Sequence, residues 1–303
     1  MKTLLWLASF VLVTACAVSA AQAPPLASDA EIAEAEAGAL RQDWVAWNNP
    51  RAPFKVIGDI YFVGTDNLGI YLITTPQGLI LLDGGLPQSA PQVEANIATL
   101  GFNVRDIKFL LNTHAHIDHA GGLARIKRDS GATFVASEGD RPALEAGQVD
   151  YGPTAGMRFP PVRVDRVVGD GDTVSLGGVT LTAHMTPGHT KGCTSWSMTT
   201  NDAHGAPRNV FFTCSETVAG QSLAPESWPG MVAAYRTTFA RVRTLHADVF
   251  LGPHANFFDL DAKRARQQAG DADAFIDPTE LQRFNDEMER QFNDELARQQ
   301  AAH

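Results

Sequence analysis

Short apolar runs separated by turn residues dominate the pattern of residues 54–83. The runs at 60–63, 70–73 and 79–82 have the length and the β-branched content of strands, and Gly, Asn, Asp and Pro lie between them. They predict a β-meander. A similar run at 107–111 predicts a short buried strand.

Strand-like runs recur through the second half of the chain, and helical spacing recurs between the two sets of strands. The further predicted strands lie at 164–168, 173–176, 179–184, 194–199, 210–213 and 249–251. The predicted helices lie at 88–100, 121–128 and 229–245. This order predicts an α/β fold in which two β-sheets pack face to face with helices outside, an αββα sandwich.

The two ends of the chain differ from this body. Residues 21–50 are rich in Ala and Pro and predict an extended arm with no more than one helical turn. Near the C-terminus, Asp277 and Pro278 have the positions of an N-cap and a first helical residue. We expect this helix to pack on the body through an apolar stripe, rather than to serve as an oligomerisation arm. The stripe consists of Leu281, Phe284, Met288, Phe292 and Leu296.

Composition bounds the class of protein. The length of 303 residues allows a substantial core, and we expect residues 21–303 to form a single domain. The formal net charge of −10 disfavours nucleic acid and anionic lipid as partners. We expect a monomer that binds a small molecule, with no protein partner implied.

The N-terminal residues have the pattern of a secretory signal. A Lys at position 2 precedes a short apolar run, and Val18-Ser19-Ala20 resembles a cleavage site, so residues 1–20 predict a signal peptide and a periplasmic protein. The run Val13-Thr14-Ala15-Cys16 also resembles a lipobox, which would make the protein lipid-anchored through Cys16. The sequence leaves the soluble and the anchored forms open.

Two further cysteines, Cys193 and Cys214, lie in predicted strands of the same half of the chain. An oxidising compartment permits a disulfide between them. Two separate small buried side chains satisfy the same pattern. We favour the disulfide, although the sequence does not show whether their Cα atoms are close enough to form it.

The candidate metal-ligating residues are concentrated in one short motif, His114-Ala115-His116-Ile117-Asp118-His119, which directly follows the strand predicted at 107–111. Imidazole and carboxylate groups are zinc ligands, and catalytic zinc keeps a position open for water. Four such side chains cannot converge from one regular strand or helix, whereas a loop can direct them toward two metals. A polar helix N-terminus capped by Asp118 is the alternative, and it gives no reason for three neighbouring His residues.

Two metals need further ligands. His189 and His254 each lie in a turn after a predicted strand, where a rigid scaffold can hold a ligand. We therefore predict His114, His116 and His189 for one metal, and Asp118, His119 and His254 for the other. The remaining His residues receive no role; these are His184, His204, His246 and His303.

These motifs resemble the metallo-β-lactamase superfamily, whose fold is an αββα sandwich. The resemblance extends beyond the His motif to Trp47-Asn48-Asn49-Pro50, Leu82-Asp83-Gly84-Gly85 and the stretch from Pro187 to Trp196. Over nearly all of residues 44–303 the chain resembles class B β-lactamases of subclass three. The resemblance also implies that Asp83 is structural and braces the His loop.

One position separates this chain from other branches of the superfamily. Relatives that resemble glyoxalase II or lactonases carry a bridging Asp where this chain has Ser215, and other β-lactamase subclasses use a Cys ligand nearby, whereas Cys214 lies one residue early. The resemblance then implies that Ser215 and Thr217 bind the substrate carboxylate.

The function implied is hydrolysis of the amide bond of β-lactam antibiotics by water activated on two Zn²⁺ ions, with Asp118 as a catalytic residue. The alternatives are a superfamily hydrolase of another ester, thioester or lactone, and a non-catalytic metal-binding protein. The sequence does not show which β-lactams are preferred or how fully zinc occupies both sites.

Overall fold

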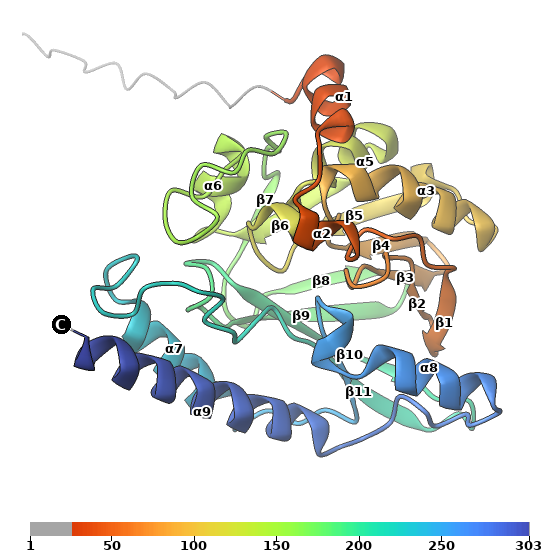
Figure 1. Ribbon diagram of the computed structural model, residues 1–303. Coiled ribbons are helices and arrows are strands. Elements are labelled where there is room, and N and C mark those ends of the chain that lie inside the picture. The colour runs from red at the N-terminus through yellow and green to blue at the C-terminus, as the bar shows by residue number, and fades with distance from the viewer. Residues whose placement is uncertain (1–25, 303) are drawn as a thin grey trace, which may run out of the picture.

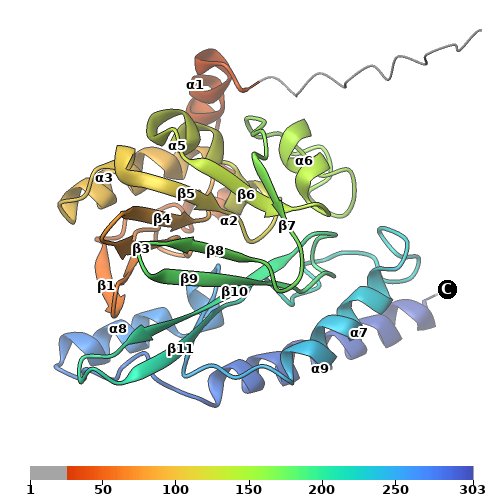
Figure 2. The same ribbon diagram turned by 180° about the vertical axis from the view of Figure 1, so that it is seen from behind.

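The computed structural model describes residues 26–302, in which two β-sheets pack face to face between outer layers of helices (Figure 1). Figure 2 shows the same layers from behind. Most of the outer layers consist of α1 (Asp29–Ala37), α3 (Ala90–Thr99) and α5 (Leu123–Ser130) over one sheet, and α7 (Met231–Val242) and α9 (Glu280–Ala301) over the other. The predicted αββα sandwich is confirmed.

The first sheet has seven strands that follow one another in chain order. They are β1 (Phe54–Ile57), β2 (Ile60–Phe62), β3 (Tyr71–Thr75), β4 (Gly78–Leu82), β5 (Ile107–Leu111), β6 (Thr133–Ser137) and β7 (Arg166–Val168). The first four form the predicted antiparallel meander, and β4 to β7 run parallel to one another. Helices cross between the parallel strands, as a parallel connection requires.

The second sheet has five strands in the order β12-β11-β10-β9-β8. They are β8 (Thr173–Leu176), β9 (Val179–Met185), β10 (Thr194–Asn201), β11 (Pro207–Phe212) and β12 (Val249–Leu251). Neighbours from β8 to β11 are antiparallel, and β12 is parallel to β11. Gly177 and Gly178, both at positive φ, form the hairpin turn between β8 and β9.

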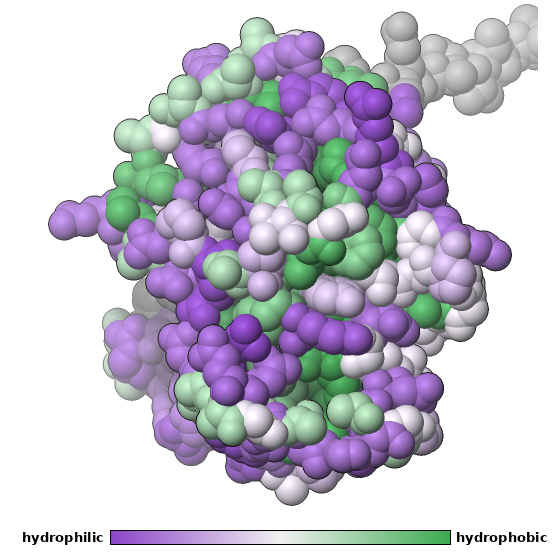
Figure 3. Space-filling model, turned by 90° about the vertical axis from the view of Figure 1, so that its right-hand side faces the viewer, coloured by the Kyte–Doolittle hydropathy of each residue, from purple (hydrophilic) through white to green (hydrophobic). Residues whose placement is uncertain are grey.

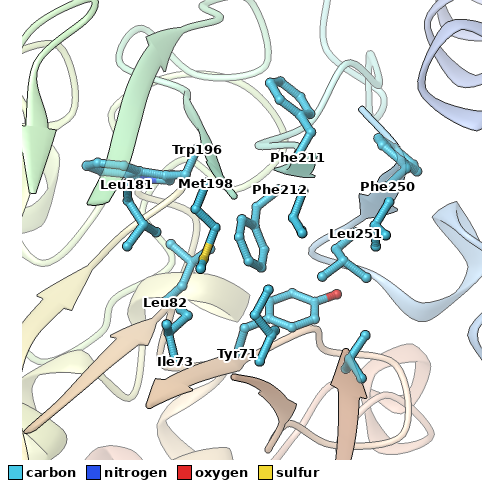
Figure 4. Close-up of a cluster of buried hydrophobic side chains, with 14 of the residues drawn as sticks. Tyr71, Ile73, Leu82, Leu181, Trp196, Met198, Phe211, Phe212, Phe250 and Leu251 are labelled. Carbon is cyan, nitrogen blue, oxygen red and sulfur yellow. The ribbon is translucent and has the colours of Figure 1, made fainter. Parts of the chain in front are cut away.

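Side chains of the central strands point alternately to the two faces of the sheet and contribute to two separate hydrophobic cores. Ile80 and Leu82 of β4 point into the core between the sheets, whereas Leu79 and Leu81 point into the core under the helices. Figure 4 shows the core between the sheets, where Tyr71 and Leu82 of the first sheet face aromatic side chains of the second. Because both faces of the first sheet are covered, its central strand β4 has buried apolar residues at four consecutive positions, from Leu79 to Leu82.

The N-terminal arm differs from the prediction. Residues 26–50 contain the nine-residue helix α1 and the short helix α2 (Gln42–Val45), rather than an extended arm with one turn. Helix α1 buries only Ile32, so it has no apolar stripe that a sequence pattern could reveal. A capping box of Ser28 and Glu31 stabilises its start.

Several further elements were not predicted from the sequence. Among them are β6, α6 (Arg141–Ala146) and α8 (Leu260–Gln268). Helix α6 has one fully buried apolar side chain, Leu144, and α8 buries Leu260 and Lys263. Neither therefore presents the repeated apolar spacing by which a helix is identified.

The C-terminal helix α9 packs on the body as predicted, but it starts later. It begins at Glu280, after the N-cap Thr279. The Asp277 carboxylate accepts the Thr279 N–H at 2.9 Å and so stabilises the turn before the helix. The predicted apolar stripe contacts α7 through Phe292, whose ring lies 5.0 Å from that of Tyr235.

The surface is mainly polar. The face in Figure 3 is largely hydrophilic, with apolar side chains gathered in small patches. Among residues 26–302, no helix has both the length and the apolar character needed to cross a bilayer. The predicted signal peptide, the lipobox at Cys16 and His303 lie outside the described residues.

Candidate metal centre

The candidate site lies where several strands end at their carboxyl ends. Asp83 follows β4, the run from His114 to His119 follows β5, His189 follows β9, Ser215 follows β11 and His254 follows β12. In the first sheet β4 runs parallel to β5, and in the second β11 runs parallel to β12. Strand β9 has the same direction as β11, because both are antiparallel to β10 between them. Their carboxyl ends therefore bring distant residues to one edge of the sandwich, a common place for ligand sites.

The first predicted set of ligands comes together. Donor atoms of His114, His116 and His189 all lie within 4.8 Å of one another. The His116 Nδ1 lies 3.0 Å from the His189 Nε2. The His114 Nε2 is buried and has no hydrogen-bond partner among the described residues. A buried nitrogen without a partner is costly, so a cation at this position fits the donor set.

The second predicted set also comes together. The Asp118 Oδ2 lies 3.3 Å from the His119 Nε2 and 3.5 Å from the His254 Nε2. Asp118 lies in the short helix α4 (Ile117–Ala120), but no side chain caps that helix. The alternative of a helix N-terminus capped by Asp118 is therefore wrong. Each set offers three ligands, as two metal ions with open positions require.

The electrostatics of the two sets differ. Burial lowers the pKa of His116 to about 4 and holds the pKa values of His114 and His189 well below their usual range, so these imidazoles are neutral and free to coordinate. Burial alone would also lower the pKa of His119, but the carboxylates of Asp118 and Asp83 outweigh it and raise that pKa to about 10. The second set thus holds a positive charge beside Asp118, which a metal ion could replace.

Asp83 braces the His loop, as the resemblance implied. It adopts φ +67°, and its carboxylate accepts the Thr113 N–H at 2.7 Å and the Thr113 hydroxyl at 2.6 Å. Its Oδ2 also lies 3.7 Å from the His119 Nδ1. A carboxylate on the far nitrogen of an imidazole fixes the orientation of the ring and leaves the other nitrogen for a metal.

Two other predicted ligands are oriented by contacts that the sequence did not predict. The His189 Nδ1 lies 2.8 Å from the Thr217 carbonyl oxygen. The His254 Nδ1 lies 3.4 Å from the Asn67 amide, and the Trp47 ring meets the His254 ring edge-on at 5.1 Å. In the sequence, Asn67 is only one of the turn residues between two predicted strands. No local pattern could link it to His254, which lies 187 positions away.

Cys193 and Cys214 form a disulfide, with their Cα atoms 5.7 Å apart. It joins the start of β10 to the end of β11, directly behind the His114 loop. Since both sulfurs are in the bond, neither thiol is free to take the place of a ligand. The disulfide is the pairing that we favoured from the sequence.

Members of both ligand sets line a cleft of about 900 Å³; they are His116, Asp118, His189 and His254. Trp44 and Trp47 from the N-terminal arm form one wall, and Pro153 and Thr154 form part of another. The N-terminal arm and the loop after α6 therefore flank the cleft. Ser215 and Thr217 line the same cleft, with their hydroxyl oxygens 3.1 Å apart. Their role toward a substrate stays a prediction.

Comparisons with known proteins agree with this geometry. Residues 70–201 match the family model described as the metallo-β-lactamase superfamily. The chain is 47% identical to BJP-1, a subclass B3 metallo-β-lactamase of Bradyrhizobium japonicum, with a TM-score of 0.81 over 85% of this chain and 98% of that one. It is 37% identical to FEZ-1 from Legionella gormanii, with a TM-score of 0.80 over 84% of this chain and 98% of that one.

Curated sequence relatives match over a shorter stretch. A hydroxyacylglutathione hydrolase of Hyphomonas neptunium is 34% identical over 127 residues, which are 42% of this chain and 41% of the relative. The chain thus spans about two fifths of the length of the first curated relatives that it matches.

Proposed function

The chain belongs to the metallo-β-lactamase superfamily, and from this we propose that it is a zinc-dependent β-lactamase. The substrate would be a small β-lactam, such as a penicillin, a cephalosporin or a carbapenem. The reaction would be hydrolysis of the cyclic amide bond, which would confer resistance to these antibiotics. The observation that carries the proposal is the pair of complete ligand sets beside Ser215, with members of both sets lining one cleft.

In this reaction the residues of the site would bind the two zinc ions and orient the attacking water. His114, His116 and His189 would hold one zinc ion, and Asp118, His119 and His254 the other. Bound zinc lowers the pKa of its water toward 7 and polarises carbonyl oxygens. The imidazoles of His119 and His254 hold the pKa of Asp118 well below its usual range despite its burial, so its carboxylate is ionised and can orient the attacking water.

We propose a β-lactam rather than a thioester as the substrate because of a residue just after β11, Ser215. Ser215 stands where the related thioester and lactone hydrolases would carry a bridging carboxylate, and the Asp118 set is complete without one. The similarity to BJP-1 over 98% of that chain supports the same choice, whereas hydroxyacylglutathione hydrolase is matched over 41% of its length. Thioester hydrolysis is therefore the second candidate.

Metal removal tests the proposal directly. We expect the zinc-loaded protein to hydrolyse a carbapenem and a cephalosporin, and dialysis against a chelator to abolish both activities while far-UV circular dichroism is retained. The absorbance of the β-lactam ring reports its hydrolysis. Addition of zinc to the dialysed protein should restore both activities. A folded, zinc-loaded sample that hydrolyses a glutathione thioester but no β-lactam would contradict the substrate and favour the second candidate.

The two hydroxyls at the end of β11 provide a test of substrate binding. A hydrogen bond to a charged group contributes about 1.5–3 kcal/mol, so Ser215→Ala and Thr217→Ala should each raise KM by roughly 10- to 100-fold with a smaller change in kcat. The backbone carbonyl of Thr217 that orients His189 remains in Thr217→Ala. Steady-state kinetics on a penicillin measure both constants.

Two controls separate this role from general damage to the cleft. Thr217→Ser keeps a hydroxyl and should retain a KM near that of the wild type. A β-lactam whose carboxylate is esterified should bind the wild type and the Ala variants equally weakly. Equal loss of activity toward the acid and the ester would show that these hydroxyls do not bind the carboxylate.

The proposal extends to the compartment. A disulfide beside the metal centre is compatible with an oxidising periplasm, where β-lactams meet their targets. Residues 1–20 would direct export, with or without a lipid on Cys16. Fractionation of cells that express the full chain, compared with a Cys16→Ala variant, distinguishes the soluble from the anchored form.

A further inference from the structure

A buried carboxylate behind the metal centre contacts two of the loops that carry ligands. Asp140 lies between β6 and α6 and is 2% exposed. Its Oδ2 accepts the Ala115 N–H at 3.0 Å and the Thr190 hydroxyl at 2.8 Å. Its Oδ1 accepts the Gly192 N–H at 2.8 Å. Asp140 thus has three donors, and none of them is a metal ligand.

Two of the donors to Asp140 lie next to predicted metal ligands in the sequence, and this placement indicates its structural role. Ala115 lies between His114 and His116, and Thr190 directly follows His189. The carboxylate therefore joins the two loops that supply all three ligands of the first set. His119 and His254, from the second set, have other partners in Asp83 and Asn67. Two of the residues that Asp140 contacts, Ala115 and Thr190, directly adjoin ligands of the first set and none of the second.

The backbone around Asp140 is packed closely enough to fix this arrangement. A Cβ at Gly192 would lie 2.2 Å from the Asp140 N and 2.2 Å from the Ser137 Oγ. A Cβ at Gly139 would lie 2.6 Å from the Lys191 carbonyl oxygen. The turn that holds Asp140 therefore lies directly against the loop after His189, with no side chain between them.

We propose that Asp140 is a positioning residue for the first metal site, which holds the His114–His116 loop and the His189 loop at the spacing that a metal requires. The proposal rests on the metal-binding part of the proposed function and not on the substrate. It assigns to Asp140 a role separate from that of Asp83, which orients the His loop from the other side through Thr113 and His119.

An Asn cannot replace this carboxylate, because its amide nitrogen donates hydrogen bonds and would face donors. The fold should survive Asp140→Asn, because the Thr194 N–H still donates to the Thr113 carbonyl between the two ligand-bearing segments. The Ser137 hydroxyl also still joins β6 to the His189 loop through the Gly192 carbonyl. Supporting groups of this kind typically change metal affinity by about 10- to 100-fold. The loss should be confined to the first site.

The test measures metal affinity site by site in the full-length protein. An Asp118→Ala background keeps the three His ligands of the first site, and a His116→Ala background keeps the second site intact. Zinc affinity is measured by competition with a chromophoric chelator, and cobalt substitution reports the ligand geometry by its visible absorption. No β-lactam is used, so the result does not depend on the proposed substrate.

We expect Asp140→Asn to lower zinc affinity by roughly 10- to 100-fold in the Asp118→Ala background and to alter its cobalt spectrum. In the His116→Ala background the affinity should change by less than about threefold. The matched control is Asp165→Asn, since Asp165 accepts the Phe134 N–H and the Lys127 ammonium but contacts neither ligand loop. It should leave both sites unchanged.

Unchanged affinity of the first site, or an equal loss at both sites, would overturn the proposal. If Asp140→Asn does not fold, Thr190→Val provides a second test, because it removes one donor and leaves the carboxylate with its two backbone N–H groups. We then expect the zinc affinity of the first site alone to fall by roughly three- to tenfold. No loss in that variant would also overturn the proposal. Absence of zinc binding by the Asp118→Ala background itself would refute the metal-binding part of the proposed function, and this inference with it.

Discussion

Asp118→Asn should lower kcat/KM for a β-lactam by roughly 10³- to 10⁴-fold while the protein remains folded. The variant loses the only carboxylate of the second ligand set, whose Oδ2 lies within 3.5 Å of both imidazoles of that set. It loses at the same time the anionic group that would orient the attacking water. The fold should persist because the ion pairs of Asp118 are confined to the site itself.

The matched control is another acid in the same cleft. Asp261 lines the cleft, and its side chain is 80% exposed and pairs with Arg51. Asp261→Asn changes the charge of the cleft equally but removes no ligand, so its kcat/KM should stay within about threefold of the wild type. Full activity of Asp118→Asn, or an equal loss in Asp261→Asn, would contradict the role assigned to Asp118. Zinc content measured on the same samples separates lost metal from lost catalysis.

Glu216→Gln should stabilise the protein at alkaline pH by an amount on the order of 5 kcal/mol. Glu216 is 1% exposed, and burial raises its pKa to about 8 although the Thr213 hydroxyl donates to it. Its Oε2 is buried and has no hydrogen-bond partner among the described residues. The folded protein must therefore bury a poorly solvated charge when Glu216 ionises.

The sign of the pH dependence follows from the direction of this shift. The pKa of Glu216 is raised above the ordinary value of 4.5, so between pH 4.5 and 8 the folded protein binds this proton and the unfolded chain does not. The contribution to stability is fully present below pH 4.5 and falls by about 1.4 kcal/mol per pH unit until pH 8. Gln is neutral throughout, so the variant lacks this loss.

Urea unfolding at pH 5, 7 and 9 measures the difference. Glu216→Gln and the wild type should have similar free energies of unfolding at pH 5 and should diverge as the pH rises. Glu138→Gln is the control, because the Glu138 side chain is 73% exposed and its charge is solvated in both states. Parallel curves for Glu216→Gln and the wild type would show that Glu216 is ionised without cost in the folded protein.

The elements that the sequence predicted correctly are those with a strong local pattern. The meander of β1 to β4, the strand β5 and the apolar stripe of α9 were all visible as runs or periodic spacings. The elements that it missed have weak patterns: α1 buries only Ile32, and α8 buries one apolar residue, Leu260. The start of α9 was placed too early because Asp277 stabilises the preceding turn instead of the helix.

The grouping of the six ligand residues could be predicted because the chemistry of each type is unusual and four of them are adjacent. His, Asp and His at such spacing have few uses other than coordination. His189 and His254 were recognised because each follows a strand in a turn. The resemblance to the superfamily then placed Asp83 beside the His loop, where its contacts with Thr113 confirm it.

What the sequence by itself determined is thus the fold class and the grouping of six candidate ligand residues into two sets, since local patterns and short motifs encode them. Only the tertiary structure decided the roles of Asn67, Asp140 and Glu216. Their properties depend on burial and on partners from distant segments, such as Gly192, which is 52 positions from Asp140. Hydrogen bonding and desolvation act through space, so a carboxylate on a surface loop and one behind a metal centre look the same in the sequence.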